Sequence, residues 1–188
     1  ASAACLAADL ALLLQQARAL GLELDGIAVD WSKCYDHLPL GTLQHVARAA
    51  GIPDRVFRPM LAAYSHPRRI VADGHTGELR PPVSGLPPGC PAATHWLALV
   101  MHCWAQEIRA AVPDADHREY VDDLTAHRLH APEPNPVPPV LAMVAVTADL
   151  AEDWSLKLNH QKSCCFSTSK QTRDALQTLS EIPPAASY

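Results

Sequence analysis

Two acidic segments, far apart along the chain, constrain its fold most strongly. The first, Asp30-Trp31-Ser32-Lys33-Cys34-Tyr35-Asp36, follows the apolar run 26–29, and the second is Tyr120-Val121-Asp122-Asp123, between the strand-like runs 117–121 and 124–129. If these strands are neighbours, three carboxylates meet at one end of a small sheet. Such a cluster repels itself unless a divalent cation lies within it, and Mg²⁺ prefers oxygen ligands. The pattern predicts two-metal phosphoryl-transfer chemistry.

Length and composition indicate one domain in a reducing compartment. The chain has 188 residues, of which 48% are hydrophobic, enough for a proper core. Polar residues interrupt the apolar stretches, so no membrane span is expected. The six cysteines show no CxxC pairing, and residues 1–14 lack a basic leader and read as a helix cut from a longer chain. We expect an intracellular protein, in the nucleus or the cytoplasm.

The net charge of −5 bears on nucleic-acid binding. An acidic site accounts for part of it, because bound metal ions neutralise carboxylates. A broad basic surface for phosphate backbones is missing from the sequence. Either another part of a longer protein supplies that surface, or the chain binds nucleic acid weakly by itself.

Periodicity and turn residues predict an α+β domain, with helices packed on one face of a largely antiparallel sheet. A proline-rich segment, 131–139, is expected to be an extended connector. The expected helices are 3–20, 39–50, 54–64, 92–111 and 140–154, and the expected strands are 26–31, 69–73, 78–83, 117–121, 124–129 and 164–167.

Four segments in this order resemble the palm of reverse transcriptases, especially those of non-LTR retrotransposons and group II introns. The first family block has the form Asp-x-x-Lys-Ala-Phe-Asp, which corresponds to the segment from Asp30 to Asp36. The second, Gly-x-x-Gln-Gly-x-Pro-x-Ser, corresponds to Gly85-Leu86-Pro87-Pro88-Gly89-Cys90-Pro91-Ala92-Ala93. The third is Tyr120 to Asp123, and the fourth is Leu156-Lys157-Leu158-Asn159-His160-Gln161-Lys162.

This resemblance implies a polymerase palm with partial fingers over residues 1–169 and no thumb. Residues 170–188 would be a C-terminal tail, either the start of a missing thumb or disordered. The implied function is RNA-directed DNA polymerase, which adds deoxynucleotides to a primer 3′-hydroxyl. The implied partners are an RNA template, a DNA primer, deoxynucleoside triphosphates and the missing fingers, thumb or other domains of a longer polyprotein. Two Mg²⁺ ions, with Mn²⁺ as a substitute, would be the cofactors.

The resemblance also assigns site residues. Asp30, Asp122 and Asp123 would hold the metals, and Lys162 would protonate or neutralise pyrophosphate, although an ordinary surface lysine is an equal interpretation. The Trp31 carbonyl would complete a metal shell. Tyr35 would lie under the incoming sugar and exclude a ribose 2′-hydroxyl, unless it is a core tyrosine. The nucleotide-binding loop would contain Gly85, Pro88 and Gly89.

Two departures from the family pattern keep an alternative open. Pro88 replaces the glutamine of the second block, which removes a side-chain donor and a backbone N–H, and Ala93 replaces its serine. The alternative is a catalytically inactive retroelement remnant that acts as a nucleic-acid-binding or structural module. An RNA-directed RNA polymerase is a further alternative, which Tyr35 opposes. Zinc is not expected, because His95, His102 and Cys103 have no evident second ligand pair.

Overall fold

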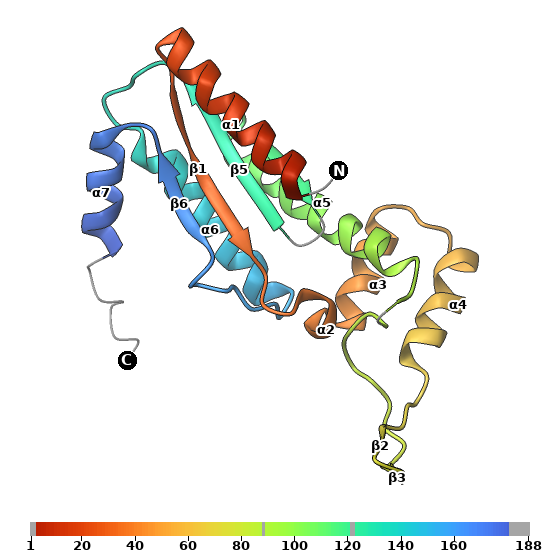
Figure 1. The fold of residues 1–188 in the computed structure, drawn as a ribbon. Helices are drawn as coiled ribbons and strands as arrows, with labels where there is room; N and C mark the ends of the chain where they lie inside the picture. Colours follow the sequence, from red (N-terminus) through yellow and green to blue (C-terminus); the bar gives the residue numbers. More distant parts are fainter. Residues whose placement is uncertain (1–2, 88, 121–122, 181–188) are drawn as a thin grey trace, which may run out of the picture.

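A four-stranded antiparallel sheet lies at the centre of the fold (Figure 1). The structure, a computed structural model, describes residues 3–87, 89–120 and 123–180. The strand order is β4-β5-β1-β6, so β1 lies between β5 and β6 and pairs antiparallel with both. The sheet strands are β1 (Glu23–Asp30), β4 (Asp116–Tyr120), β5 (Asp123–His130) and β6 (Cys164–Ser167).

The helices surround this sheet and complete the predicted α+β fold. Helices α5 and α6 contact each other and lie behind the sheet in Figure 1, whereas α3 and α4 lie to one side of it. No helix in the described part of the chain is long and apolar enough to cross a membrane. The helices are α1 (Ala3–Leu20), α2 (Cys34–His37), α3 (Leu40–Ala49), α4 (Asp54–Ser65), α5 (Ala93–Ala111), α6 (Val137–Asp153) and α7 (Lys170–Ser180).

The core forms between one face of the sheet and helices α5 and α6. Ile27 and Val29 of β1 are buried, and their partners on β5, Ala126 and Leu124, are buried beside them. Residues two apart on a strand share a face, so this alternation aligns the apolar side chains of both strands. Between the two helices, the Trp104 indole N–H donates to the Thr147 hydroxyl at 3.0 Å. That bond satisfies the polar atom of a completely buried tryptophan.

The hairpin between α4 and α5 is tighter than the sequence predicts. Its strands are only β2 (Val71–Ala72) and β3 (His75–Thr76), whereas we expected strands over 69–73 and 78–83 around a loop at 74–77. The turn is formed by Asp73 and Gly74, whose φ angles are 49° and 77°. An Asp-Gly pair with two positive φ angles favours a two-residue hairpin turn. The turn therefore lies closer to the N-terminus than the expected loop at 74–77.

The proline-rich connector is shorter than expected. Helix α6 begins at Val137, so Pro138 and Pro139 lie in its first turn rather than in an extended segment. Proline is tolerated there, because the first N–H groups of a helix have no intrahelical partner. The prediction that residues 137–139 are extended was therefore wrong.

Gly26 provides a test of the sheet geometry. A Cβ atom at this position would overlap the Ala126 carbonyl oxygen and lie 2.8 Å from Phe166 Cζ. We expect Gly26→Ala to lower the free energy of unfolding by roughly 1–3 kcal/mol, the usual range for overpacking. The control is Gly41→Ala, since a Cβ at that position in α3 meets nothing within 4 Å. Urea denaturation measures both, and equal stabilities would contradict this close approach.

Candidate active site

The pairing of β1 with β5 brings the two acidic segments together. Asp30, the last residue of β1, is the register partner of Asp123, the first residue of β5. Opposite residues of an antiparallel pair have Cα atoms about 4.5–5.5 Å apart, and their side chains share a face of the sheet. Asp122, the third expected metal ligand, lies outside the described residues.

The two aspartates lie on the face of the sheet opposite their buried neighbours. Val29 and Leu124 are buried in the core, so alternation turns Asp30 and Asp123 to the other face. Asp123 is exposed, and the Asp30 side chain is 20% exposed. Like charges directly opposite on paired strands destabilise a sheet, and a cation between them removes that cost. Carboxylate oxygens within reach of solvent are a donor set that fits a hard divalent ion.

The segment 157–163 lies against the end of β1. The backbone N–H of Asp30 donates to the Ser163 hydroxyl at 3.1 Å, and the N–H of Asn159 donates to the Asp30 carbonyl at 2.9 Å. The Lys162 ammonium is 3.7 Å from Asp30 Oδ1. Its side chain is 69% exposed, so this pair is loose and easily rearranged. The structure thus brings Lys162 to the expected carboxylate, and it adds Ser163, which sequence reasoning missed.

The side chain and the backbone of Trp31 lie in different surroundings. The indole is buried in the core, at 2% exposed, and makes no hydrogen bond within the described residues. Trp31 pairs with Leu158 as an isolated bridge. The two hydrogen bonds of this bridge are made by the backbone of the neighbouring residues Asp30 and Ser32. The Trp31 carbonyl is therefore outside that ladder.

The glycine-containing loop is bound to the turn that follows Asp30. The N–H of Gly85 donates to the Leu38 carbonyl at 2.9 Å, and the N–H of Leu86 donates to the Tyr35 carbonyl at 2.7 Å. Gly85 has a φ of 91°, and a Cβ on it would be 3.0 Å from the Asp36 carbonyl oxygen. This position therefore requires glycine for both conformation and space.

The remaining predicted residues in this region are Gly89, Pro88 and Tyr35. Gly89 also has a positive φ, 77°, but a Cβ there would meet nothing within 4 Å. Pro88 lies outside the described residues. Tyr35 is half-buried, and its hydroxyl donates to the Thr94 hydroxyl at 3.4 Å, a weak bond. The side chain packs against the core while the residue stays partly exposed.

A thiol in the same loop has an altered acidity. The Tyr64 hydroxyl is 3.1 Å from Cys90 Sγ, and this hydrogen bond is the main cause that lowers the pKa of the Cys90 thiol. The pKa of Tyr64 is raised, chiefly by burial and further by Cys90. A hydrogen bond donated by the Tyr64 hydroxyl thus stabilises the Cys90 thiolate more than water would stabilise an ordinary cysteine thiolate. Nothing in the sequence pattern indicates this contact, because α4 and the loop are separated by the hairpin.

Comparison with known families identifies the chain. The family model described as "Reverse transcriptase (RNA-dependent DNA polymerase)" matches residues 8–176. The chain therefore belongs to the reverse transcriptase family. No curated protein matches the sequence.

Solved structures of telomerases resemble this fold. Apo telomerase from Candida tropicalis, truncated from its C-terminal domain, has a TM-score of 0.61 at 13% identity over 89% of this chain. Telomerase from the same species, in complex with a TWJ fragment of telomeric RNA, has a TM-score of 0.65 at 12% identity over 90%. The corresponding Candida albicans complex has a TM-score of 0.55 at 14% identity over 90%. The chain spans only 36%, 30% and 31% of those proteins, so the likeness concerns the shared polymerase-palm fold.

The Tyr64–Cys90 hydrogen bond predicts a reactive thiol. Because the pKa of Cys90 is lowered, a larger fraction is thiolate at pH 7 than for an ordinary cysteine. We expect Tyr64→Phe, which keeps the ring, to raise that pKa and slow alkylation of Cys90 by iodoacetamide severalfold. Mass spectrometry across pH measures the rate at each cysteine. Cys103, whose pKa is raised by burial, is the internal control, and an unchanged Cys90 profile would contradict the assignment.

Proposed function

We propose that this protein is an RNA-directed DNA polymerase, which adds deoxynucleotides to a primer 3′-hydroxyl by two-metal nucleotidyl transfer. The observation that carries this proposal is the pairing of Asp30 with Asp123 at the end of two central strands. Asp30, Asp122 and Asp123 would hold two Mg²⁺ ions, or Mn²⁺ in their place. Bound there, the ions would lower the pKa of the primer hydroxyl and stabilise the leaving pyrophosphate.

The chain's own residues would orient and neutralise the reactants. Lys162, close to Asp30 and largely exposed, would protonate or neutralise pyrophosphate. The Trp31 carbonyl, outside the local ladder, would add an oxygen ligand. The glycine-containing loop, with Gly85, Pro88 and Gly89, would let backbone approach the nucleotide closely.

The proposed substrates are an RNA template, a DNA primer and deoxynucleoside triphosphates. Membership of the family supports an RNA template, and two of the similar telomerases are solved with a telomeric RNA fragment. The chain covers 30% and 31% of those two proteins, and its net charge is −5. We therefore propose that fingers, thumb or other domains of a longer polyprotein supply the basic surface that grips the duplex.

A nucleic-acid-binding or structural module without catalysis is the second candidate. Ala93 favours it, because the family pattern has a serine at this position, and here the side chain is a buried methyl group that cannot donate a hydrogen bond. The net negative charge of the chain, −5, also favours a protein without catalysis.

Primer extension on an RNA template distinguishes these two functions. With Mg²⁺ and deoxynucleotides, we expect incorporation by the intact protein and a loss of at least about a hundredfold in Asp30→Asn or Asp122→Asn, the scale of removing a charge-stabilising group. The matched control is Asp153→Asn, at an exposed position at the end of α6, which should retain activity.

The possible outcomes test the assignment of the metal ligands separately from the polymerase activity. Incorporation that persists in Asp30→Asn and Asp122→Asn would contradict the site assignment. No incorporation by the intact protein, combined with retained RNA binding, would support the non-catalytic module.

Tyr35 predicts sugar selectivity. If the ring lies under the incoming sugar, Tyr35→Ala should raise ribonucleotide incorporation relative to deoxynucleotide incorporation by roughly ten- to a hundredfold, as expected when one steric contact is removed. Tyr35→Phe keeps the ring and should keep the discrimination. Single-nucleotide incorporation assays give the ratio of kcat/KM values. A ratio that stays the same in Tyr35→Ala would leave Tyr35 as a core residue.

A further inference from the structure

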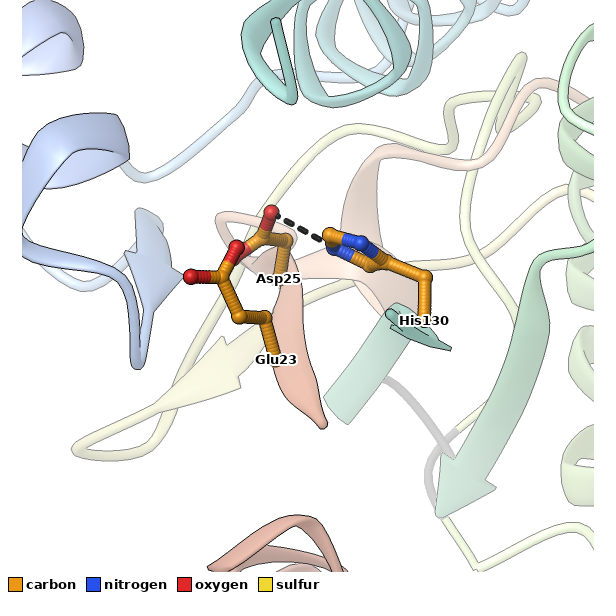
Figure 2. Close-up of side chains that lie close together, drawn as sticks. All are labelled: Glu23, Asp25 and His130. Atoms are coloured by element: carbon orange, nitrogen blue, oxygen red, sulfur yellow. Dashed lines mark hydrogen bonds and ion pairs between the residues drawn. The ribbon is translucent and has the colours of Figure 1, made fainter. Parts of the chain in front are cut away.

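A second cluster of metal-ligating side chains lies at the opposite end of β1 from Asp30. Figure 2 shows Glu23 and Asp25 on β1 and His130 at the end of β5, with their side chains turned toward one another. One ligand atom from each lies within 4.8 Å of the others. Asp25 and Asp30 are five steps apart along the strand, roughly 16 Å. This cluster is therefore distinct from the proposed polymerase site.

Asp25 is a completely buried carboxylate. Its side chain is 0% exposed, and its hydrogen-bond partners among the described residues are His130 and the Ser167 hydroxyl, which donates to Oδ1. Burying a carboxylate without a compensating positive charge costs several kcal/mol. The serine is neutral, and Arg128, the register partner of Asp25, is paired with Asp114 and Glu133. His130 is therefore the bonded partner through which a compensating positive charge can reach Asp25.

The surroundings of His130 fix the position of one ring proton. Nδ1 is 2.8 Å from the Ala131 carbonyl oxygen and 3.6 Å from a Glu133 carboxylate oxygen. Both of these atoms are acceptors, so Nδ1 carries a hydrogen. In the neutral ring, Nε2 then presents a lone pair to Asp25 Oδ2 at a distance of 2.9 Å. Two acceptors at this distance repel each other unless a second proton or a metal ion lies between them.

Glu23 favours the metal ion over the proton. It is the register partner of His130 and adds a second carboxylate to the cluster. A protonated ring would bring one positive charge to two carboxylates, whereas a divalent ion would bring two. Glu23 also lines a cavity of about 670 Å³, together with Ser167, Thr168, Arg18 and Arg173. The cavity reaches the cluster at Glu23 and leaves room for water to complete the coordination of an ion.

We propose that Glu23, Asp25 and His130 bind a divalent transition metal of the Zn²⁺ class. Zinc takes imidazole nitrogen and carboxylate oxygen at about 2.0–2.2 Å in a tetrahedral site, which places neighbouring ligand atoms roughly 3.3–3.6 Å apart. Binding would therefore move Nε2 and Oδ2, now at 2.9 Å, about half an ångström farther apart. An imidazole ligand favours such a metal over Mg²⁺. The Ala131 carbonyl and the Ser167 hydroxyl are the outer partners that orient the ligands. The ion joins the start of β1 to the end of β5.

Zinc titration of the intact protein tests this site. The Asp30→Asn variant serves as the background, since it removes a ligand of the proposed polymerase site. We expect one Zn²⁺ per chain by calorimetry, a rise in melting temperature, and a visible absorption band when Co²⁺ replaces Zn²⁺. Glu23→Gln should weaken Zn²⁺ binding by at least about tenfold, a cost that even outer-shell partners reach. That variant leaves the Asp25–His130 pair intact and so should still fold.

Two controls make the result decisive. His130→Gln should remove the Zn²⁺ response, and His45→Gln, at an exposed position in α3, should preserve it. Zn²⁺ affinity that is unchanged in both Glu23→Gln and His130→Gln would mean adventitious binding elsewhere. Absence of one-to-one binding, with both His130 ring nitrogens protonated in ¹⁵N NMR at neutral pH, would identify a buried imidazolium–carboxylate pair and overturn the proposal.

Discussion

The continuous pairing of β1 with β5, from Glu23 opposite His130 to Asp30 opposite Asp123, is the interaction on which the rest of the structure depends. It aligns Ile27 and Val29 with apolar partners over the core and turns both terminal aspartates to the other face. Because side chains alternate, a slip of one residue would exchange these faces. Gly26, where a side chain would strike the Ala126 carbonyl, lies in the middle of this pairing and permits the close approach of β5 and β6.

Much of this architecture could be predicted from sequence, because its signals are local. Helical spacing of apolar residues and the breakers at their ends predict α1, α3, α4 and α5 to within a few residues. The expected proximity of Asp30 and Asp123 needs only two strand assignments and one pairing. The errors occurred where turn chemistry or proline decides a boundary: the Asp73-Gly74 turn shortened the hairpin, and Pro138 and Pro139 proved compatible with a helix start.

The remaining features depend on contacts that no local pattern encodes. The Tyr64–Cys90 hydrogen bond joins a helix to a distant loop, and the Asp25–His130 contact spans most of the chain. An acidic residue in a strand usually indicates a solvated face, yet Asp25 is fully buried. The sequence directs attention to the helical residues His95, His102 and Cys103, whereas strand register brings Glu23, Asp25 and His130 together. The third expected carboxylate, Asp122, remains a prediction.

The bonds around the glycine-containing loop have a consequence for how this chain can vary. Pro39 pairs with Ser84, and the N–H of Gly85 donates to the Leu38 carbonyl. The two ends of the segment that contains α3, α4 and the small hairpin are therefore held side by side. A segment whose two ends are paired with each other can change in length at a small cost in free energy, because the pairing at its ends is unaffected. Within residues 40–83, α3 and α4 bury side chains in the core and α3 contacts α5, whereas residues 68–80 are exposed and closed by the Arg68–Arg80 bridge. The hairpin is therefore the part whose length can change without disturbing the core.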